Sequence, residues 1–173
     1  ITYLAPNYGG INLEDISAPC CFEIEERLKA TLDIPVFHDD QHGTAIVVLT
    51  GIINGLRLTG KKKEECKVVV NGAGSAGIAI TKLLLTYGFT NVTMCDREGI
   101  IGKDYPSLNW MQKKMTEVTN LSQATGTLAD ALKGADIFVG VSAPNIVTSE
   151  MVASMNKDSI LFAMANPVPE IMP

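Results

Sequence analysis

The chain has 173 residues, of which 46% are hydrophobic and 19% are charged, and its formal net charge is −5. These proportions are ordinary for a globular protein with a core. The mild acidity disfavours a nucleic-acid or anionic-membrane surface, because such surfaces need a basic patch. We therefore expect neither a nucleic acid nor a membrane as a partner.

The four cysteines predict no disulfide framework. None belongs to a C-x-x-C pair, and the adjacent Cys20 and Cys21 do not suit the geometry of a disulfide, so we expect a reducing, cytoplasmic setting. The longest nearly apolar stretch, residues 45–56, is too short to span a bilayer. The chain starts at Ile1 and stops at Pro173, soon after a proline-rich turn, and we expect it to be a fragment that lacks both ends of a longer protein.

The first sixty residues predict a loop, a helix, a short extended segment and a second helix. Residues 1–19 contain glycines and prolines that favour a loop. Over residues 21–32, apolar side chains recur at helical spacing among charged ones, which predicts an amphipathic helix. Residues 34–37 contain a proline that favours extended backbone. Residues 44–58 are mostly apolar and predict a buried helix that ends near Gly60.

Apolar strands alternate with helices in the rest of the chain. The predicted strands are residues 67–71, 91–96, 136–142 and 159–165, and the predicted helices are residues 75–87, 108–118, 127–133 and 148–155, with a loop over 99–107. This alternation is typical of the α/β class with a doubly wound parallel sheet. We place a domain boundary near residues 60–66, so that residues 1–60 belong to one domain and residues 61–173 form a second, Rossmann-type domain.

The first strand of the second domain leads into a G-x-G-x-x-G fingerprint. In dinucleotide-binding domains, the first glycine (here Gly72) permits a tight turn, the second (Gly74) lets the backbone approach a pyrophosphate, and the third (Gly77) lets helix and strand pack closely. The phosphates then face the free amides of the following helix. An acid ends the next strand, Asp96, 19 positions after Gly77, near the ~20 expected for a ribose-binding carboxylate. The alternatives are a glycine-rich turn without a ligand and an aspartate that only caps its strand.

The residue pair at the end of that strand leaves the choice of nucleotide open. The Asp96 carboxylate favours NAD, because it can bond the ribose hydroxyls and repels a 2′-phosphate. Arg97 stands beside it and could accept that phosphate. The sequence therefore predicts NAD or NADP without deciding between them.

Two acidic pairs precede the predicted nucleotide-binding domain. Glu14-Asp15 and Asp39-Asp40 each follow an apolar stretch and precede a helix. Mg²⁺ and Mn²⁺ prefer carboxylate oxygens in octahedral arrangement, so these acids are candidate metal ligands. Two other interpretations stay open: an aspartate of the second pair caps the following helix, or the first pair is a solvated turn.

Two histidines flank the second acidic pair. His38 and His42 lie four positions apart, a spacing that can place two zinc ligands on one helix face. His38 precedes the predicted helix, however, and the segment lacks the H-E-x-x-H order of zinc enzymes. We therefore expect local hydrogen-bonding roles for both histidines.

Six segments of the chain, taken together, resemble the malic enzyme family. They are GGINLEDISAP, IPVFHDDQHGTA, VVNGAGSAGIAI, CDREGII, TGTLADALKGADIFVGVSAP and FAMANPVPEIMP, and they occur in the family's order over nearly the whole chain. The HDDQHGTA form resembles the shorter, bacterial-type branch. The resemblance implies a truncated Rossmann-type domain that binds NAD or NADP, preceded by the C-terminal part of an α/β domain that binds metal and substrate.

The resemblance also implies roles for individual residues. Glu14, Asp15 and Asp40 would bind Mg²⁺ or Mn²⁺. Asp39 would orient a catalytic lysine base that this chain does not contain. Contacts to the cofactor would come from Thr44, from the phosphate-loop residues Gly72, Gly74, Ser75, Ala76 and Gly77, from Asp96 at the ribose, with Arg97 beside it, and from the strand-end residues Ser142 and Ala143. Asn166 would contact the nicotinamide ribose or the substrate, and the alternative is a turn residue before Pro167.

The implied reaction is the oxidative decarboxylation of L-malate to pyruvate and CO₂, with reduction of NAD or NADP. The family's catalytic lysine and tyrosine lie upstream of the first matching segment. No lysine or tyrosine of this chain lies in a matching motif, although Tyr3 and Tyr8 are close to the first segment. We therefore expect the chain to bind metal and nucleotide but not to turn over malate alone. The family also implies a homo-oligomer, a dimer, for the full-length parent.

Two alternative functions remain at this point. The first is a non-catalytic nucleotide-binding module, which the missing lysine and tyrosine favour for the isolated chain. The second is a metal-independent Rossmann dehydrogenase, such as an amino-acid dehydrogenase. The acidic pairs argue against the second alternative, because a dehydrogenase without a metal has no use for Glu14, Asp15 and Asp40 together.

Overall fold

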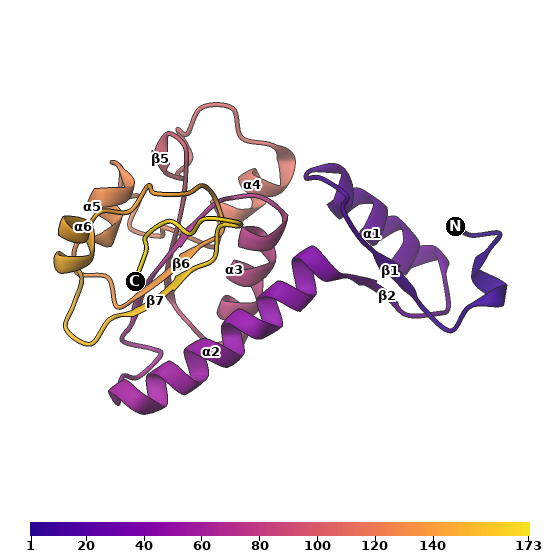
Figure 1. Ribbon diagram of the computed structural model, residues 1–173. Helices are drawn as coiled ribbons and strands as arrows, with labels where there is room; N and C mark the ends of the chain where they lie inside the picture. The colour runs from indigo at the N-terminus through magenta and orange to yellow at the C-terminus, as the bar shows by residue number, and fades with distance from the viewer.

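A five-stranded sheet forms the centre of the larger part of the molecule (Figure 1). The computed structural model describes all residues, 1–173. The strands of this sheet are β3 (Lys67–Asn71), β4 (Asn91–Asp96), β5 (Gly99–Ile100), β6 (Ile137–Gly140) and β7 (Ile160–Ala163). They are ordered β5-β4-β3-β6-β7, and every neighbouring pair is parallel except β4 and β5. The predicted parallel sheet of the α/β class is thus confirmed.

The strand β5 lies in a segment that we expected to be a loop. It pairs antiparallel with β4, with Asp96 opposite Gly99 and Cys95 opposite Ile100. Gly99 has a φ of +104°, and a Cβ there would lie 2.1 Å from the carbonyl oxygen of Gly126, so the hairpin requires glycine at this position. A strand of two residues is too short to show an alternating pattern in the sequence.

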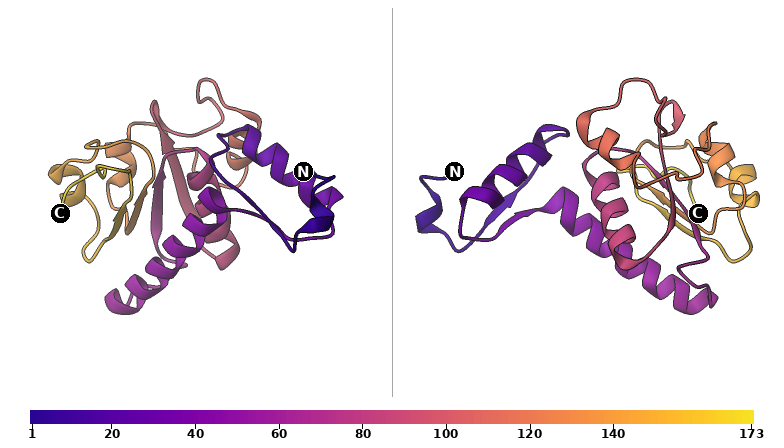
Figure 2. Two further views of the ribbon diagram at one scale, coloured as in Figure 1. Left: turned by 45° about the vertical axis from the view of Figure 1, so that its right-hand side comes forward. Right: turned by 180° about the vertical axis from the view of Figure 1, so that it is seen from behind.

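Helices cover both faces of the sheet (Figures 1 and 2). On one face lie α2 (Thr44–Thr59) and α3 (Ser75–Tyr87), which share a core with Val68 and Val70 of β3. On the other face lie α5 (Leu128–Leu132) and α6 (Ser149–Ala153), which pack around Val69. Because both of its faces are covered, β3 is a continuous apolar run, with its three valines completely buried.

The N-terminal unit, residues 1–38, projects from this layered part (Figures 1 and 2). It contains the short 3₁₀-helix η1 (Ala5–Asn7), the parallel pair β1 (Ile11–Leu13) and β2 (Val36–His38), and the helix α1 (Cys20–Thr31) between these strands. Leu13, Leu28 and Val36 form its small core. The strand β1 replaces part of the predicted loop, and its three residues are again too few for a sequence pattern.

The helix α2 packs tightly on the sheet although it precedes the predicted domain boundary. Its glycines face β7: a Cβ on Gly51 would lie 2.5 Å from Phe162 Cζ, and a Cβ on Gly55 would lie 2.8 Å from Ile160 Cδ1. Small residues therefore allow the helix to approach the strand closely. The division near residues 60–66 stays a prediction, while α2 shares its core with the part of the chain beyond that division.

The short helices of the larger part begin at side-chain caps and are shorter than predicted. The helix α4 (Trp110–Met115) starts with a reciprocal capping box between Asn109 and Gln112. Thr127 and Asp130 form the same motif at the start of α5. At its end, α2 stops at Gly60 with a φ of +70°, as the sequence predicts.

None of the helices combines the length and the hydrophobicity that crossing a membrane requires.

A nearly buried acid links residues at the amino ends of the central strands by hydrogen bonds. Asp136, just before β6, accepts hydrogen bonds from Lys61 Nζ at 2.8 Å and Asn156 Nδ2 at 3.0 Å, and its other oxygen accepts one from Lys67 N at 2.9 Å. Burial acts to raise the pKa of Asp136, but these hydrogen bonds and the charge of Lys61 outweigh it and hold the pKa below its ordinary value. The native state therefore favours the ionised carboxylate.

We expect Asp136→Asn to lower the free energy of unfolding at neutral pH by roughly 1–3 kcal/mol, because one donor loses its acceptor in a nearly buried place. A depressed pKa in the folded state gives a stabilisation that is present above about pH 4 and is lost as the pH falls through the folded pKa. Urea unfolding at about pH 7 and about pH 3 should therefore show a difference between variant and parent that shrinks in acid. Asp104→Asn, at an exposed position, is the control, and a difference independent of pH would contradict the assignment.

Candidate functional site

The glycine fingerprint forms a tight turn between β3 and α3. Gly72 has a φ of +109°, and a Cβ on Gly77 would lie 1.7 Å from the carbonyl oxygen of Gly72. These two glycines are therefore required by packing. Gly74, in contrast, has nothing within 4 Å of its Cβ position, and as the N-cap of α3 it provides no side-chain hydrogen bond to the helix amides. The first amides of α3 are thus free to bind an anion.

Neighbouring helices hold this turn from outside. Ala73 O accepts a hydrogen bond from Gln112 Nε2 of α4 at 3.0 Å. Ser75 Oγ lies 3.5 Å from Cys21 Sγ, at the start of α1. Ala76, like Ser75, is half-buried at the beginning of α3. The turn is therefore supported by both the layered part and the N-terminal unit.

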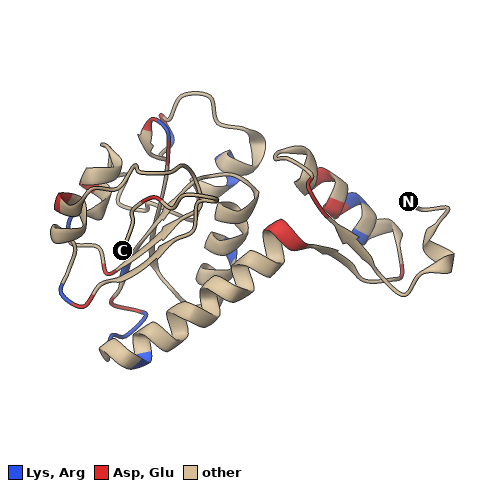
Figure 3. Ribbon diagram, viewed as in Figure 1, with Lys and Arg blue, Asp and Glu red and all other residues tan.

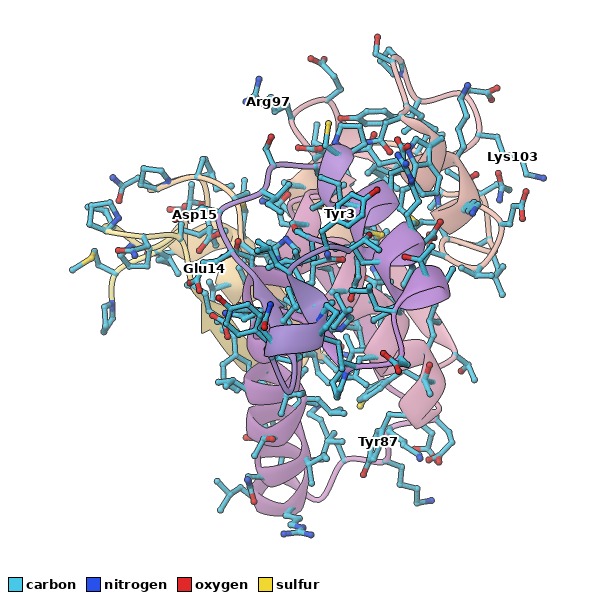
Figure 4. The ribbon with its side chains drawn as sticks, turned by 90° about the vertical axis from the view of Figure 1, so that its right-hand side faces the viewer. Tyr3, Glu14, Asp15, Tyr87, Arg97 and Lys103 are labelled. Carbon is cyan, nitrogen blue, oxygen red and sulfur yellow. The ribbon has the colours of Figure 1, made fainter.

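The end of β4 supplies the acid that the sequence assigns to the ribose. The Asp96 carboxylate accepts a hydrogen bond from Arg97 N at 2.9 Å, which fixes its orientation at the start of the hairpin to β5. Tyr105 Oη accepts a hydrogen bond from Glu98 N at 3.0 Å and braces the same hairpin. The Arg97 side chain is exposed and forms no ion pair, and it extends outward in Figure 4.

The ends of β6 and β7 lead to the remaining predicted contacts. Ser142 and Ala143 follow β6 and are exposed, as is Asn166, which follows β7. Since β3, β4, β6 and β7 are parallel neighbours, these residues lie at the same edge of the sheet as the glycine turn and Asp96. Asn71, the last residue of β3, donates a hydrogen bond from Nδ2 to Ser142 Oγ at 2.7 Å.

A buried acid that the sequence analysis did not single out joins these two strand ends. Glu170 Oε1 accepts a hydrogen bond from Ser142 N at 2.9 Å, and its Oε2 accepts one from Ala165 N at 3.0 Å. The sequence feature that could have indicated Glu170 is that it is an isolated acid among prolines and apolar residues in the last segment. Only the fold shows that this acid turns back to the sheet.

The two acidic pairs meet at the ends of β1 and β2. Leu13 pairs with His38 in the parallel register, so that each acidic pair follows its strand at the same edge. Asp15 N donates a hydrogen bond to Asp40 Oδ2 at 3.2 Å. Glu14 accepts a hydrogen bond from Asn12 Nδ2 at 3.0 Å and lies next to Asp15 in Figure 4. No group of three or more His, Cys, Asp or Glu side chains is arranged to hold a metal ion.

A π-helical turn, η2 (Asp39–Gly43), carries the second acidic pair from β2 into α2. The acidic residues at this junction appear in red at the start of α2 in Figure 3. Gly43 leaves room for the Asp39 carboxylate, since a Cβ on Gly43 would lie 2.5 Å from Asp39 Oδ1. Thr44 follows as the first residue of α2 and is half-buried. Turns of this π type occur frequently at functional sites.

Glu25 of α1 anchors the other side of this turn. Its carboxylate is hydrogen-bonded by Gln41 Nε2 at 3.3 Å, by Lys29 Nζ at 2.6 Å and by His42 Nε2. Burial acts to raise the pKa of Glu25, but the bonds and charges of Lys29 and His42 outweigh it and lower that pKa. A signal for Glu25 was present in the sequence, because it shares the helical face of the buried Cys21 and Leu28.

The two histidines differ from each other. His42 has the local hydrogen-bonding role that we expected, through Glu25. The expectation for His38 is wrong: its ring is completely buried, and neither nitrogen has a hydrogen-bond partner. The parallel pairing that buries the side chain at the end of β2 is a tertiary feature, so the sequence did not indicate it.

Two glycine substitutions test which positions of the glycine turn lack room for a side chain. We expect Gly77→Ala to lower the free energy of unfolding by about 1–3 kcal/mol or more, because its Cβ overlaps the carbonyl of Gly72. We expect Gly74→Ala to stay within about 0.5 kcal/mol of the parent, because its Cβ enters open space. Thermal or urea unfolding measures both, and equal stabilities of the two variants would contradict the observed turn.

Comparison with known proteins supports the sequence resemblance. The family model described as "Malic enzyme, NAD binding domain" matches residues 41–171. The chain is 55% identical over 170 residues to an NAD-dependent malic enzyme of Geobacillus stearothermophilus and 54% identical over 174 residues to a bifunctional malic/malolactic enzyme of Bacillus subtilis. These matches cover 98% and 100% of this chain, but only 36% and 42% of the two relatives.

A solved structure shows the same arrangement of elements. An NAD-dependent malic enzyme from Thermotoga maritima matches 99% of this chain with a TM-score of 0.96 and 50% sequence identity. The match covers 46% of that protein. The chain thus spans less than half the length of each of these relatives.

Proposed function

The chain belongs to the malic enzyme family, and from this premise we propose that it forms the nucleotide-binding core of an enzyme that oxidatively decarboxylates L-malate to pyruvate and CO₂. The observation that carries the proposal is the shared sheet edge at which the glycine turn, Asp96, Ser142 and Asn166 all lie. Ligands of doubly wound sheets bind at this edge. The electron acceptor is NAD or NADP.

The glycine turn binds the pyrophosphate of the cofactor in this proposal. The uncapped amides of α3 supply hydrogen-bond donors, and the open space at Gly74 lets the phosphates approach the backbone. Ser75 and Ala76 contribute the first amides of the helix. Binding need not order these donors, because packing at Gly72 and Gly77 already fixes the conformation of the turn.

The two ends of the cofactor bind on either side of this turn. Asp96 accepts hydrogen bonds from the adenosine ribose, and Arg97, which is free of ion pairs, faces a 2′-phosphate when NADP is bound. Ser142, Ala143 and Asn166 contact the nicotinamide half, and Thr44 lines the approach from the N-terminal unit. The strand order supports this direction, since β4 lies on one side of β3 and β6 and β7 lie on the other.

We also propose that Glu14, Asp15 and Asp40 bind Mg²⁺ or Mn²⁺. Their carboxylate oxygens are the donors that these cations prefer, and the hydrogen bond between Asp15 and Asp40 shows that the two acidic segments are in contact. The three side chains must still converge on the ion. A bound cation would polarise the oxygen of a substrate hydroxyl or carbonyl group. Asp39 orients a lysine base supplied by a part of the parent protein outside this chain.

The wider setting of the protein is part of the same proposal. Residues 1–60 form the end of the metal- and substrate-binding domain, and residues 61–173 form the nucleotide-binding domain. The last helix of the first domain, α2, packs on the sheet of the second. The parent is a homodimer in a reducing, cytoplasmic setting, which suits four cysteines without disulfides. A metal-independent dehydrogenase is the alternative, and dependence on Mn²⁺ distinguishes the two.

We expect Asp96→Ala to weaken NAD binding by roughly tenfold or more, because a charged acceptor of ribose hydrogen bonds is lost. NADP binding should fall less or improve, because the same change removes a charge that repels the 2′-phosphate. Calorimetric titration with each nucleotide measures both affinities, with Asp104→Ala as the exposed control. Unaltered NAD affinity in the variant would remove Asp96 from the ribose site.

We expect Asp40→Asn to lower the affinity for Mn²⁺ by roughly tenfold or more, because the amide replaces a charged oxygen ligand. Electron paramagnetic resonance of free Mn²⁺ measures this binding directly, without any need for turnover. Asp33→Asn, at an exposed position beyond α1, is the control. If Asp40→Asn bound Mn²⁺ as the parent does, the metal assignment would be wrong.

A further inference from the structure

Glu170, in the segment that follows β7, is a completely buried acid. Its Oε1 accepts hydrogen bonds from Ser142 N at 2.9 Å and Ser142 Oγ at 3.4 Å, and its Oε2 accepts one from Ala165 N at 3.0 Å. Both oxygens therefore face donors. An ionised carboxylate accepts hydrogen bonds at both oxygens, and the donors named here reach both.

The buried charge of Glu170 has no cationic partner in this chain. None of the ion pairs includes it, and a buried charge without a counter-charge is unfavourable. Two backbone N–H groups offset part of this cost. Gly140 makes the arrangement possible, because a Cβ there would lie 2.4 Å from Glu170 Cδ. The fold thus keeps room for a negative charge at the edge where ligands of such sheets bind.

Glu170 also connects the ends of three strands to the glycine turn. Ser142, which it holds at the end of β6, accepts a hydrogen bond from Asn71 Nδ2 at the end of β3. The backbone at Val141 lies in close contact with the turn, since a Cβ on Gly72 would lie 2.6 Å from Val141 O. On the other side, Glu170 holds Ala165, the residue before Asn166. In Figure 1 the C-terminal segment, in yellow, turns back beside β6 and β7.

We propose that Glu170 is a positioning residue for the nicotinamide half of the cofactor, and that its buried negative charge favours the oxidised cofactor over the reduced one. The proposal rests on the nucleotide site proposed above. Through Ser142 and Ala165, Glu170 fixes the two segments that contact the nicotinamide half. The oxidised nicotinamide ring carries a positive charge that the reduced ring lacks, and the carboxylate of Glu170 attracts such a charge. Glu170 therefore assists binding of the form that accepts the hydride.

Two substitutions at Glu170 test the charge and the length of its side chain separately. Glu170→Gln keeps the length of the side chain and removes the charge, whereas Glu170→Asp keeps the charge but is too short to bridge both strands. Calorimetric titration with the oxidised and the reduced cofactor gives an affinity ratio for each variant, and thermal unfolding checks the fold. Glu150→Gln, an exposed acid in the first turn of α6, is the matched control.

In Glu170→Gln, we expect the affinity for the oxidised cofactor to fall at least about fivefold more than the affinity for the reduced one. In Glu170→Asp, both affinities should fall by a similar factor, and in Glu150→Gln neither should change. If Glu170→Gln lowers the affinities for the oxidised and the reduced cofactor by the same factor, the proposal is overturned, because a purely structural role does not change the ratio of these two affinities. If Glu170→Gln does not fold, unchanged affinities in Glu170→Asp overturn it.

The unsubstituted chain tests the proposed function in the same experiment. If it binds neither form of either nucleotide, the nucleotide site itself is wrong and the role of Glu170 is overturned with it. If it binds them and only the variants fail to show the expected ratios, the nucleotide site stands and the role of Glu170 does not. The two failures are therefore distinguishable.

Discussion

The close approach of α3 to the end of β3 is the constraint on which the candidate site depends. With no Cβ on Gly77, the helix packs against the carbonyl of Gly72, and a side chain there would overlap it. This contact places the free amides of α3 at the edge where β4, β6 and β7 also end. Packing alone thus leaves a set of free amides that could bind an anion, with open space at Gly74.

Two buried or nearly buried acids fasten opposite edges of the sheet, and their partners differ. Asp136, at the amino edge, has Lys61 as a counter-charge together with a backbone amide and an asparagine, which is an arrangement that serves stability. Glu170, at the carboxyl edge, has only backbone amides and a hydroxyl. The carboxylate at the amino edge is therefore paired with a cation, whereas the carboxylate at the edge with the candidate nucleotide site has no such partner.

The N-terminal acids are connected to the sheet through η2 and α2. Glu25 holds one side of η2 through Gln41 and His42, while Asp15 contacts the other side through Asp40. The helix that follows is packed against β7. The candidate metal ligands and the sheet are thus joined by the continuous segment η2–α2, and the contact between Cys21 and Ser75 adds a second link.

The sequence by itself determined the features that depend on neighbouring residues. The strand–turn–helix at Gly72, the end of α2 at Gly60 and the alternation that predicts a parallel sheet all come from local conformational preferences and periodicity. Family membership was also accessible, since it rests on the order of short segments, and the comparisons confirm it. Only the tertiary structure decided which distant residues the acids contact. Glu170 meets Ser142 across 28 positions and Asp15 meets Asp40 across 25, and no local pattern encodes such contacts, because they form only when distant strand ends are brought to one edge.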